Sequence, residues 1–582
     1  MKGFGGGHPV LEPELELGTE VAAFALEHRS RPLRPRSVIA SLAALLVAAF
    51  AAAQDEGHDH AAEPAGTFGR VHFPVSCNAE AQEQVEHGVA LLHSFWYEEA
   101  ERAFTAAAAA DPGCAMASWG VAMSQYHPIW YPPTPAELAR GIAAVARATA
   151  IGGKTDRERA YIGAIEVFYK DADRLDHKTR AQAYEKAMEA VYRGFPEDHE
   201  AAAFYAVALL WTLSVSPTDE TNPRKAAAVL DKIAAQMPDH PGVYHYYIHA
   251  YDSPSLAPLA LDAARGYAKV APAVPHALHM PSHIFTRLGL WKESIESNLA
   301  SAAASRDFEL RTRMAGAWDQ ELHALDYLEY AYLQTGEDEK AKAIVERIRE
   351  IHSVQPQSMS AAFALSAVPA RYAVEGHRWK EAAALALAPA DFPWKSFPIG
   401  QAMNGWARAL GLIHTSDLSS ALKETDALAA LRDAVKTQPG YDWSSAVEVL
   451  RLSASGWLSH AEGRDVDART ALQAAADLED SIDKHAVSPG AILPAREQLA
   501  DFLLEAEHPE EALREYQASS RSAPNRFAAL WGGGRAAQEA GRPTQAKAFY
   551  ERLLESADPG SARPELARAK AFISRSEGSS SR

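Results

Sequence analysis

Two short histidine-rich segments hold the side chains of this sequence that are best suited to metal chemistry. The first reads HPGVYHYYIHAYD and places His245 and His249 four residues apart. The second reads PHALHMPSHIF and repeats that spacing with His279 and His283, after His276. Residues at i and i+4 share one face of a helix, and imidazole nitrogen is a good ligand for zinc, copper or iron. The pattern therefore indicates a site for a divalent transition metal.

The elements that must position these histidines are helices. Ala, Leu, Glu and Arg dominate the chain, strand-like alternation is absent, and short Gly, Pro and Asp breaks recur. A period of 34 residues is carried by small, aromatic and proline residues at fixed places, namely Gly88, Ala100, Phe104 and Pro112, and later Ala512 with Tyr516 and Ala546 with Tyr550. Small residues let two helices approach, and the aromatic ring fills the gap. We predict an all-α, tetratricopeptide-repeat-like α-solenoid of antiparallel helix pairs with loop insertions.

The chain resembles a family of exported bacterial tetratricopeptide-repeat (TPR) proteins. The resemblance is carried by the two histidine-rich segments, by LLHSFWYEEAERAF and DPGCAMASWGVAMS, and by the Pro-Ala-Arg-Tyr stretch at 369–372. It covers nearly the whole of the chain after the N-terminal segment. It implies a TPR fold and export from the cytoplasm.

The repeat register arranges the histidines as a grid. Two successive repeats carry histidine at the same two helix positions, and the next repeat adds a histidine and an aspartate at matching positions. In the TPR folds that this chain resembles, such positions line the concave groove, where packed helices lie about 8–10 Å apart. Imidazoles from neighbouring helices can then converge on one ion. The predicted metal ligands are His245, His249, His276, His279, His283, His323 and Asp326.

Other interpretations of the groove stay open at this point. It can bind a small ligand or a peptide of a partner protein, with further contacts from Tyr247, Tyr251, Arg287, His93 and His127. The stacked His and Tyr side chains can also be purely structural. The function hypotheses are a ligand-binding protein whose groove holds a metal ion, a scaffold for protein or peptide partners, and a metal-dependent hydrolase. Hydrolysis needs a general base and an open coordination position. No HExxH motif occurs, so the sequence favours binding over catalysis.

Charge and the N-terminus constrain partners and location. The 582 residues include 76 acidic and 57 basic side chains, a net charge of −19, which disfavours nucleic acid as a partner. Four arginines at 29–36 precede the apolar run VIASLAALLVAAFAAA, the pattern of a signal peptide over residues 1–53. We therefore expect a periplasmic or secreted protein. No later segment is long and apolar enough to cross a bilayer.

The remaining chain divides by composition and register. We predict a flexible linker over 54–76, an N-terminal TPR array with the histidine-rich groove over 77–350, a C-terminal TPR array over 351–573 and a disordered tail over 574–582. The two cysteines, Cys77 and Cys114, fall at or just before the starts of successive helices. An oxidising compartment favours a disulfide between them, and two buried free thiols are the alternative.

Overall fold

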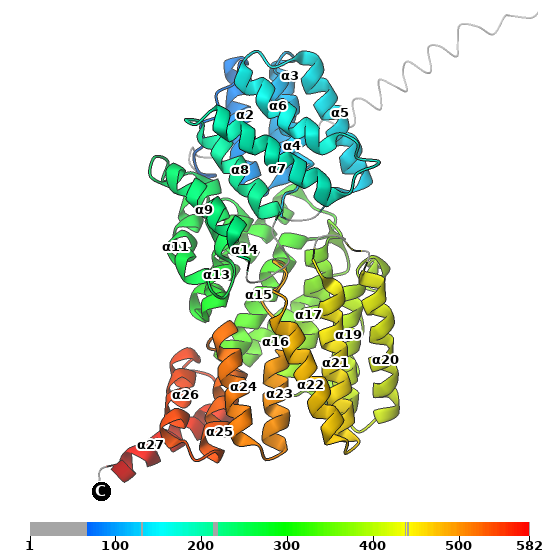
Figure 1. The fold of residues 1–582 in the computed structure, drawn as a ribbon, viewed down its shortest axis with the longest axis vertical. Helices are drawn as coiled ribbons and strands as arrows, with labels where there is room; N and C mark the ends of the chain where they lie inside the picture. The colour runs from blue at the N-terminus through cyan, green and yellow to red at the C-terminus, as the bar shows by residue number, and fades with distance from the viewer. Residues whose placement is uncertain (1–66, 130–131, 213–218, 437, 439–440, 581–582) are drawn as a thin grey trace, which may run out of the picture. The chain divides into compact units, whose positions relative to one another are not determined.

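The computed structural model describes residues 67–129, 132–212, 219–436, 438 and 441–580. Within these residues the protein is almost entirely α-helical, and sequential helices pair side by side through short turns (Figure 1). This arrangement confirms the predicted all-α, TPR-like α-solenoid. The predicted signal peptide and the first part of the predicted linker lie outside the described residues.

The helices of the first part of the chain, as far as the short strand β1 (Ala317–Trp318), supply most of the histidines. They are α2 (Ala79–His93), α3 (Tyr97–Ala110), α4 (Ala115–Ser124), α5 (Pro135–Ile151), α6 (Asp156–Tyr169), α7 (His177–Gly194), α8 (His199–Trp211), α9 (Thr221–Ala234), α10 (Pro241–Tyr251), the 3-10 helix η1 (Ala257–Ala260), α11 (Leu261–Val270), α12 (Pro275–His279), α13 (Pro281–Leu288) and α14 (Trp291–Thr312).

The second part of the chain continues the same pairing. Its elements are α15 (Asp319–Thr335), α16 (Asp338–Arg349), β2 (Val354–Gln355), α17 (Met359–Glu375), α18 (Trp379–Ala383), the 3-10 helix η2 (Trp394–Ser396), α19 (Pro398–His414), α20 (Leu418–Val435), α21 (Trp443–Ala461), α22 (Asp465–Asp480), α23 (Ala495–Glu505), α24 (Pro509–Ser522), α25 (Phe527–Glu539), α26 (Pro543–Ser556) and α27 (Pro564–Ser580). Strands β1 and β2 form one parallel ladder. Helix α27 continues into the segment that was predicted to be disordered.

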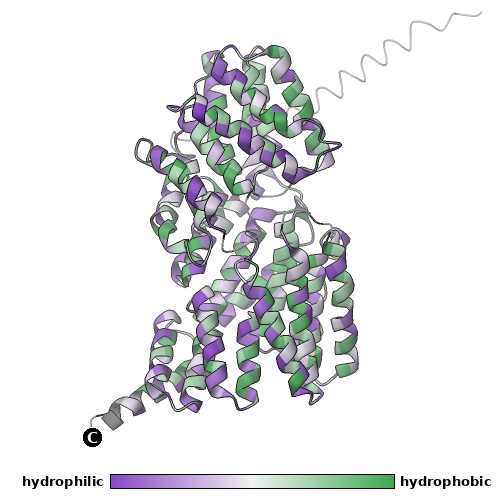
Figure 2. Cartoon of the chain, viewed as in Figure 1, coloured by the Kyte–Doolittle hydropathy of each residue, from purple (hydrophilic) through white to green (hydrophobic). Residues whose placement is uncertain are grey.

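Helix pairing depends on the small residues that define the repeat. A Cβ atom added to Gly120 would lie 2.1 Å from the ring of Phe104, and one added to Gly88 would lie 2.7 Å from the same ring. In the C-terminal array a Cβ on Gly534 would lie 2.3 Å from Tyr550. Apolar and polar residues alternate along the helices (Figure 2). Each helix pair can therefore pack an apolar face against the core while its polar face meets solvent. The predicted close contact between a small residue of one helix and an aromatic ring of its neighbour is therefore present in both the N-terminal and the C-terminal array.

Packing is continuous across the predicted boundary at residue 350. One hydrophobic cluster combines Leu322 and Leu328 of α15 with Ala361 and Leu365 of α17. The helices on the two sides of residue 350 therefore share a core. None of the helices in the described part of the chain is both long and apolar enough to span a bilayer.

The described end of the predicted linker is packed against the first repeats. Phe73 is fully buried and stacks on Trp119 with ring centroids 5.1 Å apart. Its backbone N–H donates to Glu86 at 2.9 Å. A disulfide joins Cys77 to Cys114, with Cα atoms 5.1 Å apart. The expectation of a flexible linker is therefore wrong for residues 67–76, because their apolar side chains find a partner surface that composition alone does not reveal.

Replacing Gly120 with alanine tests the close helix approach. We expect Gly120→Ala to lower the free energy of unfolding by about 1–3 kcal/mol, because the new methyl group overlaps the ring of Phe104. Gly163→Ala in α6 is the control, since nothing lies within 4 Å of its added Cβ. That control should stabilise by about 0.5–1 kcal/mol. Denaturant unfolding of both variants makes the comparison, and equal stability of the two would contradict the packing account.

Candidate metal centre: two histidine triads

Four helices of neighbouring repeats bring the histidines together. His245 and His249 lie on α10, and His276 and His279 lie on α12. His283 lies on α13, and His323 lies on α15. The sequence register predicts one continuous helix through the second group. The structure instead divides it at Met280, because Pro281 lacks the N–H that would continue the α-helical ladder. The i,i+4 relation between His279 and His283 survives this break.

The first group, named triad A, consists of His245, His249 and His276. The Nε2 atom of His245 lies 3.0 Å from Nε2 of His249 and 3.2 Å from Nε2 of His276. One ring nitrogen from each of the three histidines lies within 4.8 Å of the other two. His245 and His276 are buried and His249 is half-buried. The three nitrogens therefore face a common point beneath the protein surface.

Triad B consists of His279, His283 and His323 and repeats this plan. The Nε2 atoms of His279 and His283 are 3.1 Å apart, and the His323 ring centroid is 4.2 Å from that of His279. All three side chains are buried. Each triad thus takes two histidines from one repeat and a third from the next. The two third histidines, His276 and His323, have the same position in their repeats.

Hydrogen bonds at Nδ1 fix which nitrogen of each ring carries a proton. The Nδ1 of His245 lies 2.7 Å from the carbonyl oxygen of His93, and a carbonyl can only accept. The Nδ1 of His283 lies 2.9 Å from a carboxylate oxygen of Asp252. Both Nδ1 atoms therefore donate. The neutral rings then present an unprotonated Nε2 to their triads.

His279 is fixed in the same way by a side-chain amide. Its Nδ1 lies 2.7 Å from Oδ1 of Asn298. The amide orientation is set because Nδ2 of Asn298 donates to the Ser294 carbonyl at 2.7 Å. His279 therefore donates through Nδ1 and presents a lone pair at Nε2. In triad B the Nε2 lone pairs of His279 and His283 face each other at 3.1 Å, which is repulsive unless a cation lies between them.

Burial keeps these imidazoles neutral. Burial, followed by the neighbouring His283 and His276, holds the pKa of His279 well below its usual value. Burial, followed by His249, does the same to the pKa of His245. Burial also lowers the pKa of His283, even though Asp252 opposes that shift. Neutral imidazole is the form that coordinates metals, because a proton and a metal ion compete for the same lone pair.

The spacing of the nitrogens suits a first-row transition metal. An ion about 2.0–2.1 Å from each of two imidazole nitrogens that lie 3.0–3.2 Å apart subtends an angle of roughly 90–105°. Such angles belong to three ligands on one side of a tetrahedral or octahedral ion. Each triad therefore has the donor type and the spacing for a metal with open coordination positions on its other side.

An ion-pair network supports triad B from behind. Asp252, which accepts from His283, also accepts from Nε of Arg287 at 2.8 Å and from Lys484 at 3.1 Å. Burial opposes ionisation of this carboxyl, but Lys484 and then Arg287 outweigh it and hold the pKa of Asp252 well below its usual range. Arg287 is in turn held by Asp483 at 2.8 Å. The ring of His283 is therefore oriented by residues from both arrays.

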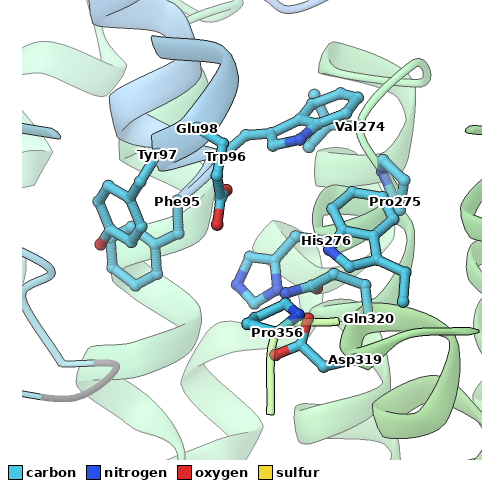
Figure 3. Close-up of a pocket in the computed structure, with 11 residues that line it drawn as sticks. Phe95, Trp96, Tyr97, Glu98, Val274, Pro275, His276, Asp319, Gln320 and Pro356 are labelled. Atoms are coloured by element: carbon cyan, nitrogen blue, oxygen red, sulfur yellow. The ribbon is translucent and has the colours of Figure 1, made fainter. Parts of the chain in front are cut away.

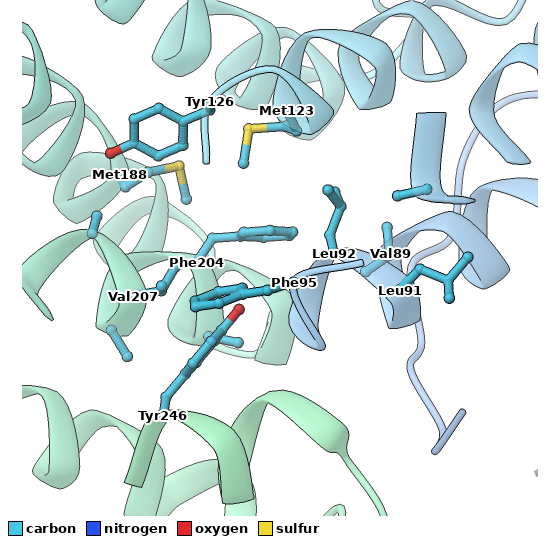
Figure 4. Packing of buried hydrophobic residues seen from close by; sticks show 14 of the residues in the cluster. Val89, Leu91, Leu92, Phe95, Met123, Tyr126, Met188, Phe204, Val207 and Tyr246 are labelled. Atoms are coloured by element: carbon cyan, nitrogen blue, oxygen red, sulfur yellow. The ribbon is translucent and has the colours of Figure 1, made fainter. Parts of the chain in front are cut away.

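Aromatic rings cover both triads. The ring centroid of Phe95 lies 4.3, 5.5 and 5.8 Å from those of the three triad A histidines. Phe95 has a positive φ of 55°, at the turn position where later repeats place Gly289 and Gly336. Other repeats place His377, Ser416 and Glu507 at this turn position, also with positive φ. Figure 4 shows Phe95 and Tyr246 in the surrounding core. At triad B, the ring centroid of Tyr327 lies 4.8–5.4 Å from those of the three histidines.

A small pocket reaches triad A. It is lined by His276, by the aromatic side chains of Phe95 and Trp96, and by the carboxyl groups of Glu98 and Asp319 (Figure 3). Its volume is about 20 Å³, and a cavity needs roughly 10–15 Å³ to hold one water molecule. The pocket therefore admits a water molecule or a bare ion, and it is too small for an organic substrate.

In a third cluster, of His93, Glu200 and His240, the carboxylate binds both imidazoles. The two carboxylate oxygens of Glu200 accept from Nε2 of His93 at 2.6 Å, from Nε2 of His240 at 3.1 Å and from the His72 backbone N–H at 3.2 Å. Nδ1 of His93 accepts from Tyr246 at 2.9 Å. His93, predicted as a groove contact, is therefore a buried support whose carbonyl orients His245.

Asp326 does not join either triad, although the sequence register predicts it as a ligand. Its Oδ1 accepts from Arg371 at 2.8 Å, and Glu329 accepts from the same guanidinium nitrogen at 2.7 Å. Arg371 is buried on α17 and lies 45 residues further along the chain. The carboxylate therefore pairs with an arginine that the histidine register does not reveal.

The other predicted groove residues also lie apart from the triads, with one exception. Tyr247 donates to Asp231 of α9 and stacks on Tyr251 with ring centroids 6.2 Å apart. His127 packs on Tyr97 at 4.7 Å. Arg287 is the exception, because it orients Asp252 behind triad B. No motif in the sequence points to Asn298, which lies on the paired helix α14 and accepts from His279.

The fold and site together define a TPR-like helical-repeat protein with two buried histidine triads. No protein-family model matches the chain, and none of the curated proteins matches its sequence. Among solved structures, a human IFIT1 dimer with PPP-AAAA aligns at 12% identity and a TM-score of 0.35, covering 83% of this chain and 92% of that one. The TPR domain of P58(IPK) aligns at 14% identity and a TM-score of 0.19, covering 86% and 99%.

Removing the amide of Asn298 tests the tautomer argument. In Asn298→Ala the Nδ1 of His279 loses its acceptor, so we expect metal affinity at triad B to fall by about 10–100-fold. Ser297→Ala is the control, because that neighbouring hydroxyl donates to the Leu278 carbonyl and touches no ring nitrogen of a triad. Competition with a chromophoric chelator measures both. Equal affinities in the two variants would count against the proposed role of Asn298.

Proposed function

We propose that this chain is an exported helical-repeat protein that binds two transition-metal ions, one in triad A and one in triad B. The observation that carries the proposal is the meeting of the His279 and His283 lone pairs at 3.1 Å, with both Nδ1 protons committed to acceptors. A buried cation resolves that repulsion. The equivalent geometry of triad A supports a second site.

The ligand atoms and the space around them limit which metals fit the triads and which activity they support. Both triads offer only imidazole nitrogen, which suits zinc, copper or iron. The pocket beside His276 has room for about one water molecule, which supports ion binding over hydrolysis of an organic substrate. Burial of the triads also disfavours the scaffold alternative, in which these histidines contact a peptide.

Metal stoichiometry tests the proposal. The protein, purified without a histidine tag and loaded with zinc or copper, should hold two equivalents by elemental analysis after removal of free metal. His249→Ala should leave one equivalent, His283→Ala should leave one, and the double variant should leave none, because each change removes a ligand from one triad.

His127→Ala is the matched control for loss of a buried histidine outside the triads, and it should retain two equivalents. A wild-type protein without tightly bound zinc, copper or iron would refute the proposal. The same conclusion would follow if metal stayed bound in the double variant, since the ion would then lie elsewhere.

Export is part of the same proposal and has its own test. The signal-like segment predicts cleavage near residue 53, and the Cys77–Cys114 disulfide suits an oxidising compartment. We expect N-terminal sequencing of the protein from a periplasmic fraction to begin just after that segment. Recovery of the intact N-terminus from the cytoplasmic fraction would contradict this expectation.

A further inference from the structure

A second cavity, separate from the pocket at His276, lies in the C-terminal array. It is lined by α17, α19, α21 and the loop at 481–494 that joins α22 to α23. Its volume is about 150 Å³. None of the triad histidines lines it, so the metal proposal gives it no role.

The walls of this cavity are mainly apolar. The loop folds back across the helices, so side chains from both meet around the space. They include Phe363, Met403, Trp443, Val449, Ile482 and Ile492. The rings of Trp443 and His485 lie at 32° with centroids 4.8 Å apart, and Tyr441 lies 4.8 Å from Trp443. Three aromatic rings, tilted relative to one another, therefore line one side.

The volume sets the size of an occupant. An apolar protein cavity of about 150 Å³ holds one benzene ring. Drug-sized ligands occupy pockets of roughly 300–1,000 Å³. The space therefore fits a single ring.

The charged groups at the edge of the cavity already have partners within the protein. Lys484 donates to Asp252, and Asp483 accepts from Arg287. Glu479 accepts from the Ala495 N–H at 2.7 Å, and burial raises the pKa of this carboxyl to about 7. Each of these groups already has a partner within the protein, so the electrostatics favour a neutral ligand.

One polar group is suited to orient such a ligand. The backbone N–H of Val487 donates to Nδ1 of His485 at 3.1 Å. The neutral His485 ring therefore carries its proton on Nε2, where it is a donor. Burial, and then Lys484, lower the pKa of His485 to about 4, which keeps the ring neutral.

We infer that this cavity is a binding site for a neutral molecule with a single aromatic ring and one hydroxyl or carbonyl group. The ring occupies the space beside Trp443 and His485, and the polar group meets His485. The site is distinct from the metal triads, so it can be tested on metal-free protein.

Ligand-observed fluorine NMR tests this site with 4-fluorophenol as the probe. We expect saturable line broadening with the full-length protein, and little or none with 4-fluorobenzoate, which has the same ring but a negative charge. Ala446→Phe, which places a ring in the cavity from α21, should weaken 4-fluorophenol binding by at least about tenfold.

Ala461→Phe is the matched control, because Ala461 is an exposed position on the same helix and should bind 4-fluorophenol as wild type does. Helical circular dichroism checks that both variants fold. Absence of saturable binding to the wild type overturns the inference. So does equal binding by Ala446→Phe and Ala461→Phe, and equal affinity for the benzoate overturns the preference for a neutral ligand.

Discussion

The placement of three Nδ1 protons is the constraint on which this structure depends. The Nδ1 of His245 donates its proton to the His93 carbonyl, that of His279 to the Asn298 amide oxygen, and that of His283 to the Asp252 carboxylate. The unprotonated Nε2 atom of each ring therefore faces its triad. Much of the surrounding network holds these acceptors in place. Glu200 anchors the His93 ring, Ser294 orients the amide of Asn298, and Arg287 with Lys484 holds Asp252. Because Lys484 belongs to the C-terminal array, the two halves of the chain cooperate in one site.

The repeat architecture explains why there are two triads. Equivalent positions of successive repeats are related by one step of the solenoid, so a ligand set that spans two repeats recurs when its residues recur. Among the described residues, the next repeat forms no third triad of this kind. Asp326 occupies the repeat position of His245 and His279, and it pairs with Arg371. At the other end, the ring of Phe95, which lies at a turn position with positive φ, covers triad A.

The sequence predicts the local part of this arrangement and misses the non-local part. The 34-residue period was enough to predict the helical pairs and to place four triad histidines in register, His245 with His279 and His249 with His283. The repeat positions also matched His323 to His276. It failed for Asp326 because the partner Arg371 lies on another repeat with no periodic relation to the histidines. It also could not predict Asn298 or Lys484, since their roles depend on side-chain geometry across helices. The prediction of a flexible linker was wrong for residues 67–76 for a similar reason, because Phe73 is buried by residues distant in sequence.

A crystal structure of the metal-loaded protein with data collected at the absorption edge of the bound metal tests the central claim most directly. The account predicts two anomalous peaks, one within about 2.0–2.1 Å of the three imidazole nitrogens of each triad. Peaks at surface carboxylates or at Glu200, with the His279 and His283 nitrogens left without an ion between them, would contradict it.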